Sequence, residues 1–184
     1  LLFCLSSLYA DFEYTLDNTN FTISQGSVFP DEKERYLYNY DRLRFRGDYS
    51  RGKLFATLIA DGLNYLGSEY VRSDSFALLQ EQKSDTPFKT QTAFHHYDEG
   101  AFYAKLYRLY GGYEDDHNRV VMGLQNISMG VGRIWTPTNL FNPKNTYALE
   151  PDEVFGVAAL SYTRHLDDTS DITAVALSLI HISE

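Results

Sequence analysis

The chain is poor in several residues and patterns that define common protein classes. Its 184 residues include one cysteine, so the fold cannot depend on an internal disulfide. No apolar run reaches the roughly 18 residues of a transmembrane helix, which excludes helical membrane spans. The net charge of −9 argues against the basic footprint of a nucleic-acid-binding protein. Nucleophile-elbow, zinc-protease and phosphate-loop motifs are all missing, so we expect neither an enzyme nor a cofactor.

The two ends of the chain differ from the rest. Residues 1–10 are apolar and stop at a small residue, as the tail of a secretory signal does; a short buried strand is the alternative. Residues 177–184 match the translated transposase mosaic-end adapter of DNA sequencing libraries, with an ordinary strand as the alternative. We therefore expect a partial signal peptide at 1–10, a natural segment at 11–176 that continues further, and an adapter-derived tail at 177–184.

What the chain has in abundance is alternation of polar and apolar residues. The clearest case runs from Arg42 to Tyr49. Because successive side chains of a strand point to opposite faces, one face would carry arginines and the other leucine, phenylalanine and tyrosine. Unpaired charges are costly in a dry core, so the arginine face must meet water. The polar positions are Arg42, Arg44, Arg46 and Asp48.

Similar alternation predicts several long strands joined by connections of alternating length. Short polar turns close three hairpins, and long stretches at 66–99 and 130–152 separate these hairpins. Residues 12–17 also alternate and are the candidate for a preceding strand, although 18–20 interrupt them. The expected strands are 36–49, 53–65, 100–113, 118–129, 153–165 and one that begins at 171.

Strand length separates two interpretations of this pattern. Strands of 11 to 14 residues exceed the roughly five or six typical of soluble sheets, and they are long enough to cross a bilayer when tilted. Outer-membrane barrels combine such strands with short periplasmic turns and longer external loops. The excess of tyrosine and phenylalanine suits strands at a water–lipid boundary. A soluble exported β-sandwich is the alternative.

A motif after the fourth expected strand resembles a known family. It reads Gly-Val-Gly-Arg-Ile-Trp-Thr-Pro at 130–137, and Phe-Asn-Pro follows at 141–143. The motif leads into a loop rich in proline and asparagine, and an acidic residue at 150, 152 or 153 precedes the next strand. This arrangement resembles Gram-negative outer-membrane porin-like barrels. The resemblance implies an all-β fold, an antiparallel transmembrane β-barrel in the cell outer membrane. With about six or seven strands, we expect an incomplete barrel, an open curved sheet.

Charged side chains on the expected lumen wall are the first candidate site. The three arginines of the alternating segment could draw anions, because guanidinium groups are permanently charged and bind carboxylate or phosphate in bidentate fashion. The alternative, which the acidic net charge favours, is that they pair with acidic residues such as Asp48 and Asp61. Lys105 adds to the field only if it faces inward. Arg108 has the opposite parity to Lys105 along the strand, so the two side chains can both face inward only if a bulge lies between them.

Aromatic residues form a second group of candidates. Tyr36, Tyr38 and Tyr40 share the arginine face and could stack sugar rings as a lumenal track. We favour instead a bulge near 39–41 that turns some of them toward lipid as a girdle. In the loop 130–152, the porin-like resemblance implies that Arg133 and Trp135 line a constriction; an external loop packed on its own side chains is the alternative.

Together these features favour a channel that passes small polar or anionic solutes by passive diffusion. Expected partners are outer-membrane lipid and small polar solutes or oligosaccharides, and open strand edges would also permit a homo-oligomer. The alternatives are a barrel that binds or exports acidic polysaccharide, an envelope enzyme and a soluble exported β-sandwich binding domain. The pore-lining or substrate-contacting candidates are Arg42, Arg44, Arg46, Asp61, Lys105, Arg133 and Trp135.

Overall fold

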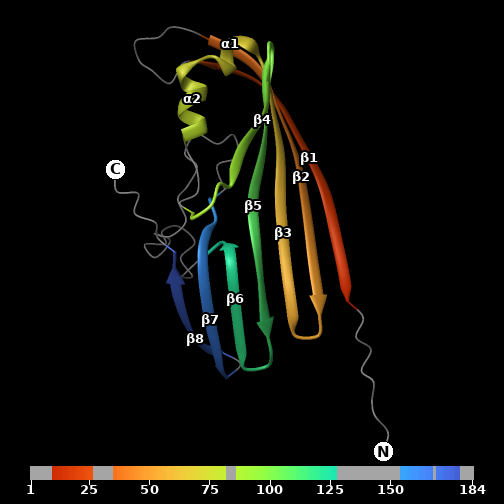
Figure 1. Ribbon diagram of the computed structural model, residues 1–184, viewed down its shortest axis with the longest axis vertical. Helices are drawn as coiled ribbons and strands as arrows, with labels where there is room; N and C mark the ends of the chain where they lie inside the picture. The colour runs from red at the N-terminus through yellow and green to blue at the C-terminus, as the bar shows by residue number, and fades with distance from the viewer. Residues whose placement is uncertain (1–9, 27–34, 82–85, 128–153, 168, 179–184) are drawn as a thin grey trace, which may run out of the picture.

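One antiparallel sheet dominates the computed structural model, which describes residues 10–26, 35–81, 86–127, 154–167 and 169–178 (Figure 1). Within these residues the sheet has eight strands, and two short helices, α1 (Ser68–Val71) and α2 (Asp74–Glu81), lie beside it. The expectation of an all-β, open antiparallel sheet is confirmed. The strands are β1 (Asp11–Gly26), β2 (Arg35–Arg51), β3 (Leu54–Leu66), β4 (Gln91–Tyr97), β5 (Gly100–Glu114), β6 (Asn118–Gln125), β7 (Val157–Asp167) and β8 (Ser170–Leu177).

The order of the strands follows the chain with one exception. Neighbours run β1-β2-β3-β5-β6-β7-β8, and β4 pairs with β5 off this path. β4 occupies the first part of the β5 edge and β6 the last part, so the two share that edge. The expectation of six or seven strands missed β4, which lies inside a stretch that the sequence analysis assigned to a long polar connection.

The tight β2–β3 and β5–β6 turns lie at the lower end of the sheet in Figure 1, whereas the two-residue β4–β5 turn lies at the upper end, near α1. The β2–β3 hairpin has a two-residue loop that begins at Gly52, whose φ of 61° is the left-handed value required at the first loop position of a type II′ turn. Residues 115–117 join β5 to β6. The short turns predicted after 36–49 and after 100–113 are therefore confirmed, and the predicted long connection 130–152 lies outside the described residues.

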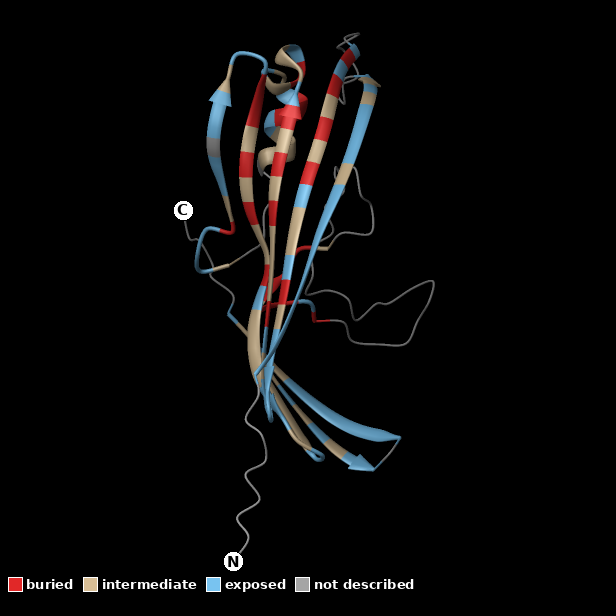
Figure 2. Ribbon diagram, turned by 90° about the vertical axis from the view of Figure 1, so that its right-hand side faces the viewer, coloured by how far each residue is buried: buried red, intermediate tan, exposed pale blue. Residues whose placement is uncertain are grey.

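Each strand has two distinct faces. The inner face carries Tyr38 and Asp61, and the outer face carries Leu16 and Phe45. Along the upper part of the central strands, buried residues alternate with less buried ones, whereas the lower part is mostly intermediate or exposed (Figure 2). The buried hydrophobic cluster on the inner face consists of Tyr36, Tyr38, Tyr40, Leu63, Tyr65, Tyr70, Phe76, Ala101 and Tyr103.

β1 continues without a break through the asparagines expected to interrupt it. All of its residues pair in register with β2, from Asp11 opposite Ser50 to Gly26 opposite Arg35. The asparagine side chains bond across the strands: Asn20 and Asn39 exchange amide hydrogen bonds of 3.2 and 2.9 Å. Asparagine is a poor strand former alone, and a cross-strand partner offsets that preference.

The connection 66–99 is folded rather than extended. Gly67 donates a 2.7 Å hydrogen bond to the Glu99 carbonyl, and its φ of 156° suits glycine. A Cβ at this position would lie 2.7 Å from the Cβ of Tyr38, so only glycine lets the chain pass this close to β2. α1 then begins directly over the inner face, and α2 follows it (Figure 1).

Several boundaries and segments differ from the sequence-based expectations. β6 ends at Gln125 rather than at 129, and β7 begins at Val157 rather than at 153. β8 includes Leu177, opposite Ala159. Residues 1–9 and 179–184, and the loop with Arg133 and Trp135, lie outside the described residues. In the part that the structure describes, neither helix is long and apolar enough to span a membrane.

Candidate functional site

An ion pair between β2 and β3 lies at the centre of the inner face. Arg44 donates two hydrogen bonds to Asp61, from Nε to Oδ1 and from Nη2 to Oδ2, each 2.7 Å long. The Asp61 side chain is 1% exposed and the Arg44 side chain 18% exposed. The register places these residues opposite each other, so the bidentate geometry needs no distortion of the strands. The sequence allowed two roles for Arg44, attraction of anions or pairing with an acidic residue of a neighbouring strand. The structure shows the pairing, with Asp61.

Tyr107 gathers three cationic side chains around its ring. The guanidinium carbons of Arg44 and Arg108 lie 4.3 and 4.1 Å from the ring centroid, and the Lys105 ammonium lies 5.5 Å away. Such a contact stabilises a cation by about 0.5–1 kcal/mol at an exposed site and by about 2 kcal/mol when the cation is desolvated. These four residues and Asp61 form the Tyr107 cluster. It holds three cations and one carboxylate, so this part of the inner face is positive although the chain is acidic.

A bulge in β5 brings this cluster together. Ile59 lies opposite Arg108 while the next residue, Ala60, lies opposite Leu106, so β5 contains one extra residue at 107. An extra residue reverses the parity of the strand positions beyond it. Lys105 and Arg108 consequently both lie on the inner face and both are buried. The opposite parity of Lys105 and Arg108 requires a bulge for both to face inward, and no local residue pattern marks its position.

Arg108 also ties the cluster to the segment before β7. Its Nη1 donates to the Tyr107 carbonyl at 2.7 Å, and its Nη2 donates to the Val154 carbonyl at 2.8 Å. The neighbouring Phe155 ring lies 4.9 Å from the Lys105 ammonium. These contacts fix both cationic side chains from two elements, which holds the charges at defined positions.

The other two arginines of β2 lie in different surroundings. Arg42 is buried, and its Nη2 donates to the Thr19 hydroxyl on β1 at 3.2 Å. Arg46 is half exposed and forms a 2.6 Å ion pair with Asp48 on its own strand. All three arginines do share the inner face, as the alternation predicts, but they do not form a uniform ladder of equivalent charges.

The row of tyrosines on β2 lies on the same face as the arginines. The prediction that a bulge turns some of them outward as an aromatic girdle is wrong. No register shift occurs where β2 pairs with β1 and β3, so no bulge near 39–41 turns Tyr36, Tyr38 or Tyr40 outward. Instead the Tyr70 ring of α1 stacks on Tyr38 with centroids 3.6 Å apart and planes 4° from parallel. Burial raises the pKa of Tyr70. This face of Tyr38 is covered, so it is not available to stack a sugar ring.

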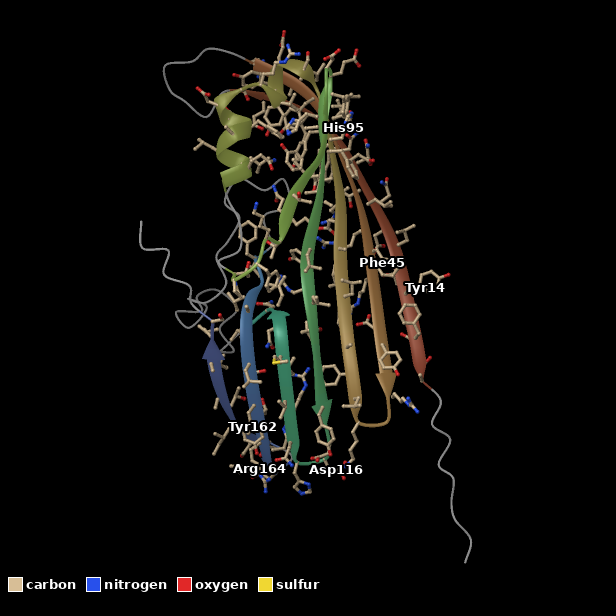
Figure 3. The ribbon with its side chains drawn as sticks, in the orientation of Figure 1. Tyr14, Phe45, His95, Asp116, Tyr162 and Arg164 are labelled. Atoms are coloured by element: carbon tan, nitrogen blue, oxygen red, sulfur yellow. The ribbon has the colours of Figure 1, made fainter. Side chains whose placement is uncertain are left out.

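The outer face carries large apolar side chains in contact with solvent. Phe12, Tyr14 and Leu16 on β1 are 59–69% exposed, and Met122 on β6 is 68% exposed. Figure 3 shows Tyr14 and Phe45 on neighbouring strands of this sheet. Contiguous exposed apolar area of this kind marks a surface that contacts something other than water.

The histidines and acidic residues of the described ranges do not gather into a metal site. No group of three His, Cys, Asp or Glu side chains there is arranged to hold a metal ion. The adjacent histidines of β4 have separate neighbours: the His95 ring stacks on Tyr97, and His96 Nε2 lies 3.3 Å from the Tyr103 hydroxyl.

Sequence reasoning missed Tyr107 and Tyr70, which organise the two inner-face clusters. Neither stands out in the sequence, since the chain holds 15 tyrosines with similar neighbours. The sequence contained one clue to the Tyr107 cluster. Lys105 and Arg108 have opposite parity on one strand, so both can face inward only if a bulge separates them.

No protein-family model, no curated protein and no solved structure matches this chain. The similarity of residues 130–143 to porin-like barrels therefore stays a resemblance.

Proposed function

We propose that this sheet is part of the wall of an outer-membrane β-barrel whose water-filled lumen passes small polar or anionic solutes by passive diffusion. The observation that carries the proposal is the outer face, which presents an apolar band of bilayer height between two polar margins. The inner face supports the same proposal, because it is charged where the outer face is apolar.

The height of the band can be derived from β3. Its outward positions are apolar or glycine from Leu54 onward, and the first polar one is Asn64. Ten residues at about 3.3 Å each span about 33 Å along the strand. A tilt of about 40° reduces this to about 25 Å along the barrel axis, which is the height of the lipid-facing band of outer-membrane barrels. The outward positions in order are Leu54, Ala56, Leu58, Ala60, Gly62 and Asn64.

Polar side chains mark the margin of the band toward the long connections. Asn20, Asp41 and Asn64 lie opposite one another on β1, β2 and β3. The Asn20 amide donates to Asp41 at 3.1 Å, and the Tyr97 hydroxyl donates to Asn64 at 2.7 Å. A carboxylate and several amides in one row require water or polar headgroups beside them.

Tyrosines mark the margin at the tight turns. The Tyr113 hydroxyl donates to Asp115 at 3.0 Å, and the Tyr162 hydroxyl donates to Asn118 at 2.9 Å. Tyr162 lies beside Arg164 at the turn end of the sheet (Figure 3). An apolar ring with its hydroxyl bonded to polar turn residues is the arrangement of an interfacial aromatic belt.

The inner face supplies the proposed selectivity. The Tyr107 cluster carries excess positive charge, and rings of arginine or lysine favour anions in pores. The helices α1 and α2 pack on the inner aromatic cluster near the long connections, which narrows the proposed lumen there. No catalysis or cofactor is required, since charge and width alone set the preference.

Reconstitution of the full-length protein in planar lipid bilayers tests the proposal. We expect discrete conductance steps, and a reversal potential in a KCl gradient that indicates preference for chloride over potassium. Membrane fractionation is the companion measurement, and the protein should require detergent for extraction. A protein that stays in the aqueous fraction and gives no conductance would contradict the proposal and favour the soluble β-sandwich.

The alternative of a polysaccharide channel has less support. Its aromatic track would be the tyrosine row, and Tyr70 already covers Tyr38 in that row. Block of the conductance by acidic oligosaccharides at micromolar concentration would revive this alternative.

A further inference from the structure

The β1 strand has a free edge. It pairs with β2 along one side, and no other strand in the described part of the chain pairs with its second side. Such an edge presents a row of backbone N–H and C=O groups to any strand that approaches it. In the proposed barrel wall this row has to be paired, because hydrocarbon offers no hydrogen bonds. The side chains of β1 therefore indicate what kind of strand adjoins it.

Three carboxylates line the inner side of this edge. Asp11, Glu13 and Asp17 share the inner face of β1, and all three are exposed. None of them forms an ion pair with another described residue. Asp17 lies opposite Arg44, but that guanidinium is bonded to the aspartate of β3 on its other side. Glu13 lies opposite Asp48, which has the same charge. The carboxylates of β1 thus lack cations on the β2 side.

A second copy of this chain offers no cations at either end of the sheet. β1 and β8 are the end strands, and neither contains lysine or arginine. Contact between the β1 strands of two copies would bring like charges together. The seven strands of the main path alternate in direction, so β1 and β8 run the same way and would pair in parallel. Every pairing in the described sheet is antiparallel, so β8 of a second copy does not fit either.

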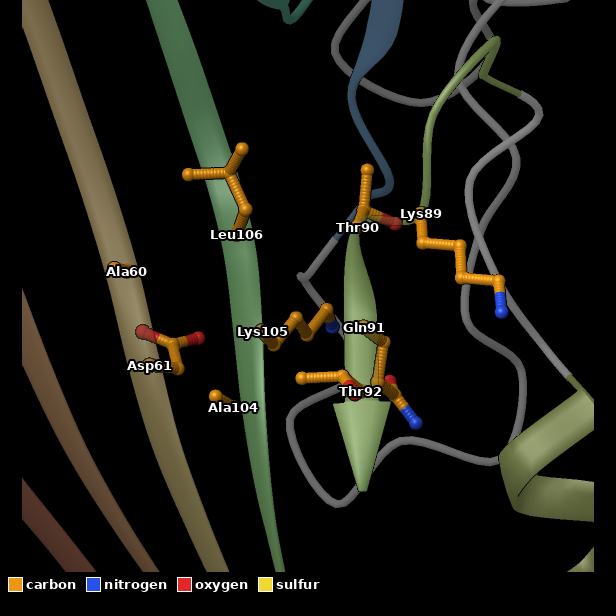
Figure 4. Close-up of a pocket in the computed structure, with 9 residues that line it drawn as sticks. All are labelled: Ala60, Asp61, Lys89, Thr90, Gln91, Thr92, Ala104, Lys105 and Leu106. Carbon is orange, nitrogen blue, oxygen red and sulfur yellow. The ribbon is translucent and has the colours of Figure 1, made fainter. Parts of the chain in front are cut away.

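Charges alternate in sign along the row of the sheet that contains Asp17. Asp17 lies opposite Arg44, and Arg44 lies opposite Asp61. Asp61 in turn lies opposite Lys105 of β5, and both line a pocket of about 280 Å³ (Figure 4). Opposite charges directly across neighbouring strands stabilise a sheet, and like charges destabilise it. Continued past β1, the alternation places a cation beside Asp17.

We propose that the strand adjoining β1 in the barrel wall is antiparallel to β1 and alternates basic and apolar residues, with lysine or arginine opposite Asp11, Glu13 and Asp17. We call this contact the β1 seam. The inference rests on the proposed function, because it takes the sheet as part of a barrel wall, and it adds the chemistry of the neighbouring strand. Without these cations, three carboxylates would face the lumen and oppose the proposed preference for anions.

Site-specific photocrosslinking of the full-length protein in membranes tests the β1 seam. A benzophenone amino acid replaces Thr15, which lies between Glu13 and Asp17 on the inner face. Mass spectrometry then identifies the captured segments, and those from β2 are set aside because Thr15 also lies opposite Arg46. We expect a further segment with lysine or arginine two residues from the attachment point. A further segment without such a cation, or capture of β2 alone, would overturn the inference.

Glu13→Lys tests the charges of the seam. The new lysine would lie opposite Asp48, which suits the β1–β2 pair, and beside the proposed cation of the adjoining strand, which disfavours the seam. Opening of the β1 edge should become about fivefold more frequent. Hydrogen exchange measures it at those amides of residues 11–17 that do not bond to β2. Reversal of the facing cation, once crosslinking has identified it, to glutamate should restore protection.

Asp171→Lys is the matched control, since Asp171 is an exposed acidic residue on the opposite end strand, β8. It should leave the exchange of β1 unchanged. Equal effects of Glu13→Lys and Asp171→Lys, or rapid exchange of the β1 edge amides in the wild-type protein, would contradict the seam. Conductance and detergent extraction of the same preparation report on the pore itself, so failure of the pore is distinguished from failure of the seam.

Discussion

At the scale of single residues, Arg44 and Asp61 show how charge is accommodated on the inner face. The aspartate is almost inaccessible, and both of its oxygens receive hydrogen bonds from one guanidinium. Such a pair adds little net stability when formed, because both ions lose water. It becomes costly when one partner is removed, since the remaining charge stays buried without compensation.

Asp61→Asn should therefore destabilise the protein strongly. We expect the free energy of unfolding to fall by about 3 kcal/mol, since the substitution leaves the Arg44 charge in place without its carboxylate. Urea unfolding of the full-length protein in detergent, followed by tryptophan fluorescence, measures this loss.

Asp48→Asn is the control for Asp61→Asn. It breaks the Arg46–Asp48 pair, whose side chains are 50% and 36% exposed. Exposed pairs are worth less than about 1 kcal/mol. Equal losses for the two variants would show that the Arg44–Asp61 pair is not as dry as the structure indicates.

A second residue-scale prediction concerns pH and the β5–β6 turn. The His117 and Asn118 backbone amides donate to the Asp115 carboxylate, and the His117 hydrogen bond is the main cause that lowers its pKa. A carboxyl whose folded pKa lies below its unfolded pKa stabilises the fold above the unfolded value, near pH 4. That contribution is lost as the pH falls through the lower folded pKa.

Amide hydrogen exchange at residues 115–118 measures this effect. Protection of the turn should persist from pH 7 down to about pH 4 and fall below it, after correction for the intrinsic exchange rate. Asp115→Asn should remove the pH dependence of the turn. Unchanged protection at pH 2 in the wild-type protein would contradict the assignment.

At the scale of elements, α1 depends on a few aromatic contacts. It has four residues, too few to be stable as an isolated helix. Its position comes from Tyr70, which stacks on Tyr38 and packs edge-on against Phe76 of α2. The helical segment is therefore an attachment to β2 rather than an independent unit.

Tyr70→Ala should release this attachment. Truncating a buried aromatic ring costs about 3–5 kcal/mol, so local opening of α1 and α2 should become at least about tenfold more frequent. Hydrogen exchange of residues 67–81 measures the opening, and Phe88→Ala, at an exposed ring, is the control. If the proposed pore is correct, Tyr70→Ala should also raise the single-channel conductance. Unchanged exchange in 67–81 would show that the stack does not hold the helices.

At the scale of the whole molecule, the outer face exposes large apolar side chains, and the inner face combines a buried aromatic cluster with charged residues. The outer face exposes phenylalanine, leucine and methionine, while the inner face contains arginine, lysine and aspartate. In the proposed barrel, water on the inner side and hydrocarbon on the outer side would suit both faces at once. The two polar margins are whole-molecule properties, because each involves residues of several strands.

Leu16→Arg tests the environment of the outer face. Leu16 is 61% exposed and lies on the outer face opposite Phe45, within the band. An arginine on the lipid face near the bilayer midplane costs about 2–4 kcal/mol, whereas an exposed surface site in water tolerates it within about 0.5 kcal/mol. The free energy of unfolding in lipid vesicles measures the difference.

Leu37→Arg is the matched control for Leu16→Arg. Leu37 is 68% exposed and lies on the same face beyond the polar margin. It should accept arginine at little cost. A similar, small effect at both positions would place the whole outer face in water and contradict the membrane proposal.

Much of this architecture could be predicted from residue order. A strand presents alternate residues to opposite faces, so alternation in the segment 42–49 was enough to separate its arginines from its apolar residues. Turn residues such as Gly52 and the acidic stretch after β5 marked the hairpins for similarly local reasons.

Only the tertiary structure could decide which side chains meet. The partner of Arg44 depends on the β2–β3 register, and the inward position of Arg108 depends on a bulge opposite Ile59 and Ala60. β4 and α1 are stable only against surfaces made by other strands. Local alternation thus determined the two faces, because side-chain direction is a property of the backbone of one strand. Long-range packing determined the charged cluster, the pocket and the covered tyrosines, because each depends on residues distant in the chain that no local pattern specifies.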